Sequence, residues 1–151
     1  MLTNQESIPV INHLIEISKD GEDGYVKASE EIDNQELKQY LLRKSNQVKQ
    51  SVIELQSLVR ELGGEPADSA SVGGKLHRMW IDIKTFIAQN DTLAVLEELE
   101  RGEDVALHSF REASLKDLPI NVAHVVSRLL AGAQRNHDEI RDMRNTAKAN
   151  K

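Results

Sequence analysis

Two carboxylates interrupt an otherwise apolar helical stripe, and their types and spacing open the question of chemistry. The stretch from Thr92 to Ser114 repeats its apolar residues with helical spacing. Glu103 projects into the middle of that stripe and Glu100 lies beside it. A carboxylate on the buried face of a helix costs free energy unless a charged or hydrogen-bonding group pairs with it. The identity of that partner therefore decides what the chain can do.

A metal ion is one candidate partner. Dinuclear iron and manganese sites in helical bundles take one Glu from each of two helices and a Glu-x-x-His from each of the other two, because positions i and i+3 share a helix face. His137 is well placed for this role, but the residue three positions before it is Gln134, a weaker neutral ligand. Glu54 lies towards the edge of its stripe and is followed at i+3 by Ser57. The ligand pattern is therefore half present.

The candidate metal ligands can nevertheless be named, and oxygen and imidazole donors suit iron or manganese. A mononuclear version would use Glu100, Glu103 and His137. No cofactor is assured by the sequence. The candidate ligands are Glu22, Glu54, Glu100, Glu103, Gln134 and His137.

The alternative is a polar layer whose groups satisfy one another. In this interpretation Glu103 and His137 pair across the bundle, and Arg144 or Arg78 completes the bonds. Glu100 precedes the turn at Asp117 by 17 residues and His137 follows it by 20, an offset of roughly 4–5 Å along antiparallel helices. Glu103 is offset by roughly 9 Å. Glu100 is thus a second candidate for the direct partner of His137.

Two further polar residues share one face of a shorter amphipathic segment, residues 76–87. Trp80 is expected to be largely buried by packing across the bundle. His77 lies three residues earlier and either hydrogen-bonds into the core or supplies the imidazole that the second helix lacks. His13, His108 and His124 lie off the apolar stripes and are expected to be exposed.

The elements that position these residues are all predicted to be helices. A capping box at Thr3 and Glu6 starts the first helix, which continues through Ala28 past two glycines. The first of these, Gly21, lies on the apolar stripe, which indicates either close approach of a neighbouring helix or a kink. A second capping signature at residues 33–36 leaves only a short turn before the next helix.

The rest of the chain follows the same pattern of helices and signals that end them. The second helix runs to about Leu62 and ends at the glycine pair 63–64. Residues 63–74 resemble a linker, and the shorter helix 76–87 follows it. A tight turn at 116–119 leads into the last helix, whose stripe extends to Ile140.

This layout predicts an all-α fold in a single domain, residues 1–151. Two antiparallel helix pairs joined by one long crossover that contains a short fifth helix is the arrangement of ferritin-like four-helix bundles. Five segments of the chain also resemble an uncharacterised bacterial family of ferritin-like four-helix-bundle proteins, known as a domain of unknown function. The segments are IEISKDGEDGY (15–25), RELGGEPADS (60–69), LHRMWIDIK (76–84), LEELERGEDVAL (96–107) and NHDEIRDMR (136–144). The resemblance implies the fold and brings no established activity.

Composition excludes several classes of function. A net charge of -6 and an aromatic content of 3% argue against nucleic-acid binding. The chain has no cysteine, no apolar run of membrane-spanning length and no secretory signal, so a cytoplasmic protein without a membrane partner is expected. Nothing resembles the extra C-terminal helix of cage ferritins, which favours a monomer or small symmetric homo-oligomer. The physiological partner is not indicated.

Two functions remain open. The first is a structural or interaction protein, with a role in stress physiology suggested by fold-level analogy alone. The second is a metal-dependent oxidoreductase or iron-handling protein that uses the core carboxylates and a histidine.

Overall fold

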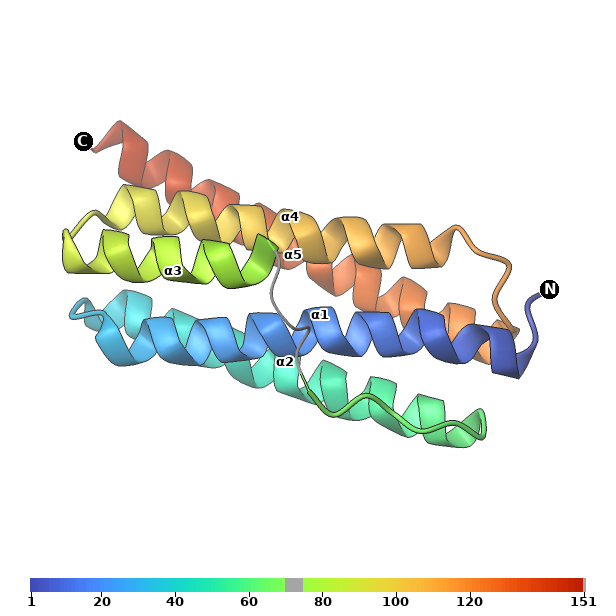
Figure 1. The fold of residues 1–151 in the computed structure, drawn as a ribbon. Coiled ribbons are helices and arrows are strands. Elements are labelled where there is room, and N and C mark those ends of the chain that lie inside the picture. Colours follow the sequence, from blue (N-terminus) through green and yellow to red (C-terminus); the bar gives the residue numbers. More distant parts are fainter. Residues whose placement is uncertain (70–74, 151) are drawn as a thin grey trace.

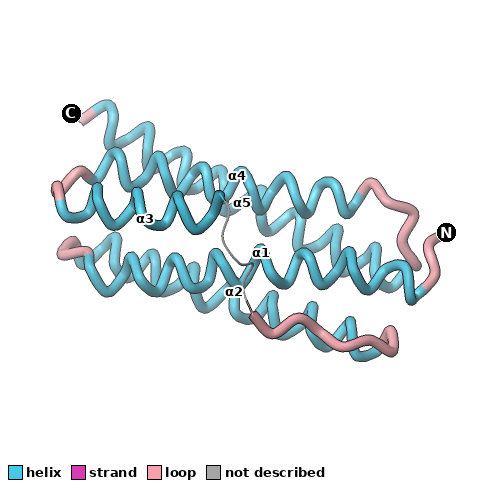
Figure 2. The backbone as a smooth tube through the Cα atoms, in the orientation of Figure 1, coloured by secondary structure: helices cyan, strands magenta, loops and turns pink. Residues whose placement is uncertain are grey.

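The computed structural model describes the backbone of residues 1–69 and 75–150 and the side chains of residues 1–69 and 82–150. Within these residues the fold is all-α, as predicted, and contains no strand (Figures 1 and 2). None of its helices is long and apolar enough to cross a membrane. The helices are α1 (Asn4–Glu31), α2 (Gln35–Glu61), α3 (Lys75–Ala88), α4 (Thr92–Ser114) and α5 (Ile120–Ala149).

The helix starts follow from their capping residues. The Thr3 side chain accepts a hydrogen bond from the backbone N–H of Glu6, whose carboxylate accepts one from Thr3 in return, so the predicted capping box is confirmed. Asn34 caps α2 and Asp91 caps α4 in the same way. The first helix continues unbroken through Gly21, so its glycines do not end it.

The four long helices form two antiparallel pairs, α1 with α2 and α4 with α5 (Figure 1). After α2 the chain runs back along the first pair, where the side chains of Asn12 and Gln56 hold the backbone of Ala67 by hydrogen bonds. The short helix α3 packs against α1 and α4. It was expected to pack across the bundle, but it lies alongside these two helices at one end of the molecule (Figure 1).

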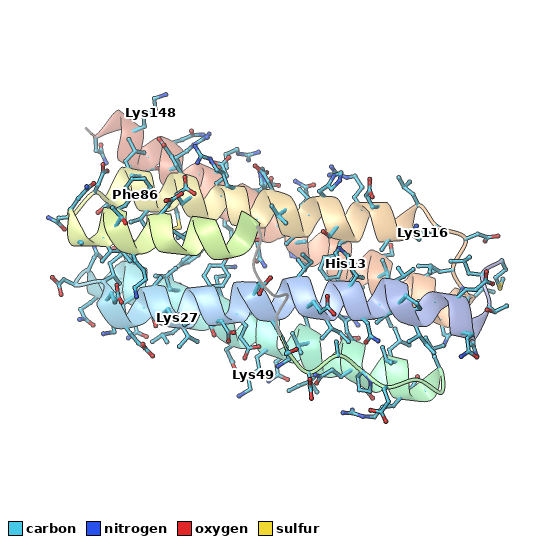
Figure 3. The ribbon with its side chains drawn as sticks, in the orientation of Figure 1. His13, Lys27, Lys49, Phe86, Lys116 and Lys148 are labelled. Carbon is cyan, nitrogen blue, oxygen red and sulfur yellow. The ribbon has the colours of Figure 1, made fainter. Side chains whose placement is uncertain are left out.

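The hydrophobic core is divided into two clusters. The first core lies where α1 begins and α2 ends, and it includes Ile11, Leu55 and Val122. The second core lies at the opposite end, where α3 joins the bundle, and it includes Leu41, Leu96 and Ile140. Charged and polar side chains outside these cores mostly project away from the bundle, and His13 is exposed as predicted, as are the histidines at 108 and 124 (Figure 3).

A group of buried polar side chains accompanies the two cores. Lys44 is 4% exposed, Glu98 4% and Glu103 7%. Charged groups are almost never buried to this extent unless they are paired. Their partners define the candidate site.

Candidate functional site: a polar cavity inside the bundle

A cavity of about 470 Å³ lies between the helices of the bundle and is partly open to solvent, and residues of all five helices line it. Its volume falls within the range of small-molecule sites in proteins, roughly 300–1,000 Å³. The lining combines apolar side chains with a comparable number of polar and charged ones, among them Asp20, Lys44, Arg128, Arg135 and Glu139. The larger apolar lining residues are Ile17, Val48, Ile83, Leu99, Phe110 and Leu129.

Glu103 is a buried acid of this lining, and its partner is a tyrosine of α1. The Tyr25 hydroxyl donates a hydrogen bond to Oε1 of Glu103. Burial, together with smaller contributions from the negative charges of Glu139 and Asp104, raises the pKa of Glu103 to about 8. The carboxyl group is therefore mainly protonated at neutral pH, and its charge is absent from the cavity.

Ion pairs connect α2 with α5. These two helices are not among the pairs whose backbones pack closely in the described part of the chain. Instead the buried ammonium of Lys44 lies 2.6 Å from Oε2 of Glu139 and 2.8 Å from Oδ1 of Asn136. Arg128 of α5 pairs in the same way with Glu54 of α2. We refer to these five side chains as the α2–α5 bridge.

Glu98 contributes a buried oxygen that has no partner. Its Oε1 accepts from the guanidinium of Arg101, one turn later on α4. Its Oε2 is buried and has no hydrogen-bond partner among the described residues. Burial raises the pKa of Glu98; Arg101 opposes this shift, and Asp82 and Glu97 add to it. Glu98 lines the cavity.

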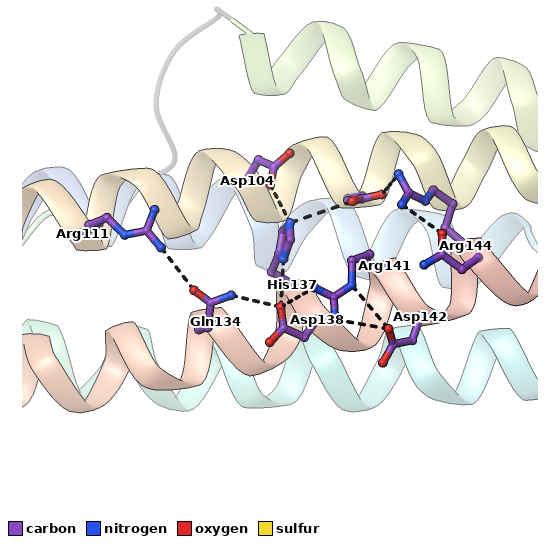
Figure 4. Close-up of polar contacts among 10 residues, drawn as sticks. Asp104, Arg111, Gln134, His137, Asp138, Arg141, Asp142 and Arg144 are labelled. Atoms are coloured by element: carbon purple, nitrogen blue, oxygen red, sulfur yellow. Dashed lines mark hydrogen bonds and ion pairs between the residues drawn. The ribbon is translucent and has the colours of Figure 1, made fainter.

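His137 belongs to a separate network between α4 and α5 (Figure 4). Its Nε2 lies 2.7 Å from Oδ1 of Asp104 and 3.9 Å from Oε1 of Glu100, and its Nδ1 lies 3.2 Å from Oδ1 of Asp138. Arg144 was expected to complete the bonds of a Glu103–His137 pair, but it places Nη1 2.8 Å from Oε2 of Glu100 instead. Neither His137 nor Glu100 lines the cavity.

The predicted pairing of Glu103 with His137 is wrong. Glu100 and Asp104 are one turn apart on α4 and both reach His137, whereas Glu103 lies about 100° around the helix from Asp104 and meets Tyr25 of α1. The comparison of heights along the two helices favoured Glu100 over Glu103, but the direct partner of His137 is Asp104 at 2.7 Å, and Glu100 lies farther away, at 3.9 Å.

The candidate metal ligands are not gathered at one place. Glu54 pairs with Arg128, and Gln134 accepts from Arg111 and donates to Asp138. Glu22 lies on α1, at intermediate exposure. Among the residues with described side chains, no three His, Asp or Glu residues are arranged to hold a metal ion. The side chains of His77 and Trp80 lie outside the described residues.

Several residues of the cavity escaped the sequence analysis. Lys44 occupies an inward position between Leu41 and Val48, a spacing that marks it as buried, but an isolated lysine is ordinarily solvated. Tyr25 fits the apolar stripe of its helix, a pattern that gives no sign of a hydroxyl partner for a carboxylate. Two adjacent acids such as Glu97 and Glu98 are typical of a solvated helix face. Only Glu97 is exposed.

Comparison with known families places most of this architecture in one group. A family model described as Domain of unknown function (DUF2383) matches residues 6–116. The match includes nearly all of α1 to α4, together with Tyr25, Lys44, Glu98 and Glu103, and ends before α5. A search of curated proteins finds no significant match. Because the family model covers well over half of the sequence, the chain belongs to the family of the domain of unknown function DUF2383.

Proposed function

We propose that this protein is a ferritin-like helical bundle with a binding function, and that its interior cavity takes up a small organic molecule. The ferritin-like assignment is supported by the order of its helices, since two antiparallel pairs are joined by one long crossover. All five helices contribute to the cavity, which supports the view that residues 1–151 form a single domain.

The cavity is the observation that carries the proposal. A binding site typically combines an apolar lining with a few fixed polar groups and titratable residues of shifted pKa. Here Tyr25 and Glu103 supply one fixed polar pair, and Lys44 with Glu139 supplies another. The pKa of Glu103, raised to about 8, meets the last criterion.

The glycines of the helices support the same conclusion. Four of them, at 21, 24, 102 and 132, lie inside helices and line this cavity. A glycine in a helix interior costs about 1 kcal/mol relative to alanine. Close approach of a neighbouring helix was one explanation expected for Gly21, yet a Cβ at that position would meet nothing within 4 Å. At Gly132 it would meet only the guanidinium of Arg135, at 3.6 Å. These two glycines therefore leave space open.

A neutral probe tests this proposal. We expect 2-phenylethanol, which has a compact apolar body and one hydroxyl, to bind the purified protein and to shift the NMR resonances of cavity residues such as Leu99 and Leu129. Gly132→Leu should abolish these shifts by filling the cavity. The matched control Ala131→Leu places the same side chain on the exposed neighbouring position of α5 and should retain them. Absence of binding, or equal binding by both variants, would refute the proposal.

A second candidate function, metal-dependent oxidation or iron handling, is the alternative that the sequence leaves open. Nε2 of His137 lies 2.7 Å from Oδ1 of Asp104 and 3.9 Å from Oε1 of Glu100, although these three side chains are not in an arrangement that would hold a metal ion as they stand. An ion there would displace Arg144 from Glu100. Elemental analysis of protein purified without chelators tests it. Stoichiometric iron or manganese that is lost in His137→Ala would support it, and a blank after supplementation with both metals would refute it.

A further inference from the structure

We infer that the cavity selects small organic carboxylates with an apolar body over neutral and cationic molecules of the same shape, an inference that rests on the proposed binding function and names its ligand class. Three features of the cavity support this class of ligand. They are a lining arginine without a carboxylate partner, lining acids that are engaged or uncharged at neutral pH, and apolar side chains around the same space.

The guanidinium of Arg135 lies beside an open position of the cavity wall. Arg135 belongs to α5 and lines the cavity, as does Gly132 one turn earlier on the same helix. Nη2 of Arg135 lies 3.6 Å from the point that a Cβ of Gly132 would occupy, so the side chain turns back along the helix towards this glycine. Because Arg135 is exposed as well, its charge is located where the cavity opens to solvent and is accessible to an entering ligand.

Among the described residues that line the cavity, Arg135 is the cation without a carboxylate partner. Lys44 contacts Glu139 and Arg128 contacts Glu54, whereas no described Asp or Glu forms an ion pair with Arg135. A guanidinium carries its N–H donors in a planar fork that fits the two oxygens of a carboxylate. A ligand carboxylate therefore gains a partner at Arg135 without displacing one.

The acids of the lining offer no comparable site to a cation. Glu139 belongs to the α2–α5 bridge, and Asp20 has an interaction of its own. Glu98 contacts Arg101 through one oxygen, and its other oxygen is closed to solvent. Glu103 is mainly protonated at neutral pH, so it does not repel an anion. A cationic ligand would have to compete for an engaged carboxylate and would be repelled by the unpaired guanidinium.

The apolar side chains of the lining suit a hydrocarbon body. Leu129 and Ala133 line the cavity from the same helix as Arg135, and Ile17 and Phe110 line it from α1 and α4. Burial of apolar ligand surface against such side chains supplies affinity that does not depend on the head group. The contact with Arg135 then sets the order of affinities among ligands that share one body.

Three probes of matched shape test the head group: phenylacetate, 2-phenylethanol and 2-phenylethylamine, each titrated calorimetrically into the wild-type protein at pH 7. We expect phenylacetate to bind about fivefold more tightly than the alcohol, the gain from one partly exposed ion pair, and the amine to bind most weakly. Arg135→Gln should reduce the preference for phenylacetate to about twofold or less. Arg60→Gln makes the same change of charge at an exposed position of α2 outside the lining and should keep the preference.

The outcomes distinguish the two proposals. Equal binding of phenylacetate and the alcohol, tighter binding of the amine, or an unchanged preference in Arg135→Gln would overturn the carboxylate selectivity while leaving the binding function intact. Failure of all three probes to bind would overturn the binding function and the selectivity together. The order of affinities in the wild-type protein tests the selectivity even if Arg135→Gln does not fold, because that measurement needs no variant.

Discussion

Replacement of Glu103 by glutamine should remove most of the pH dependence that this one buried acid gives to the stability of the protein. The side chain is 7% exposed and its pKa is raised to about 8, whereas the ordinary value is 4.5. Because the pKa is higher in the folded state, the folded protein holds a proton that the unfolded chain releases between these two values. Stability therefore falls as the pH rises from about 4.5 to about 8 and levels off above that.

The magnitude follows from linkage. Each unit of difference in pKa corresponds to about 1.4 kcal/mol, and the full penalty above pH 8 is about 4–5 kcal/mol. Between pH 5 and pH 7 the group should contribute a loss of about 2.5 kcal/mol. Glutamine has the shape of the protonated carboxyl and keeps an oxygen that accepts from Tyr25, but it does not titrate.

Urea denaturation at intervals from pH 5 to pH 8.5 measures this effect. We expect Glu103→Gln to be close to the wild type at pH 5 and to become progressively more stable than it towards pH 8. Glu97→Gln, an exposed position on the same helix, should follow the wild-type profile within about 0.5 kcal/mol. Parallel profiles for Glu103→Gln and the wild type would refute the assignment of a buried, neutral carboxyl group to Glu103.

Three other variants test individual contacts. Glu139→Ala should lower the free energy of unfolding by about 1–3 kcal/mol in urea denaturation, because it leaves the buried Lys44 ammonium without its carboxylate. Lys44→Met removes that charge and should lower the free energy of unfolding by less. A larger loss for Lys44→Met than for Glu139→Ala would contradict the bridge. Gly21→Ala should raise the free energy of unfolding by roughly 0.5–1 kcal/mol, since its Cβ enters open space within α1, so a loss of stability would show that the space is filled. His137→Ala should lower the free energy of unfolding by only about 1 kcal/mol, with or without chelator, because Arg144 still pairs with Glu100. A loss of several kcal/mol would contradict this small contribution of His137 to stability.

The helices were predictable from local signals that act within a few residues. The capping box at Thr3, the cap at Asn34 and the glycine after Leu62 fix helix starts and ends through hydrogen bonds to the nearby backbone. Apolar periodicity then orients each helix. The all-α fold and the succession of helices follow from these two kinds of information.

The partners inside the bundle were harder to predict because they depend on rotation between helices. Periodicity places Glu103 on an inward face, but it does not say whether that face meets α5 or α1. A rotation of about 100° separates a contact with His137 from a contact with Tyr25. Lys44 illustrates the same limit, because a buried ammonium becomes intelligible only once Glu139 and Asn136 are known to lie opposite it.

The division of the hydrophobic core into two clusters bears on how the protein opens. Each cluster draws residues from distant parts of the sequence: Ile11 and Val122 meet in the first core, and Leu41 and Ile140 meet in the second. Neither core therefore corresponds to a continuous segment of the sequence. Each core nevertheless has its own set of apolar contacts. Local opening energies follow such contact density. Amide protons around Leu41 and around Val122 should exchange with solvent through separate local opening reactions that differ in their sensitivity to urea. One end of the bundle can then open while the other stays folded.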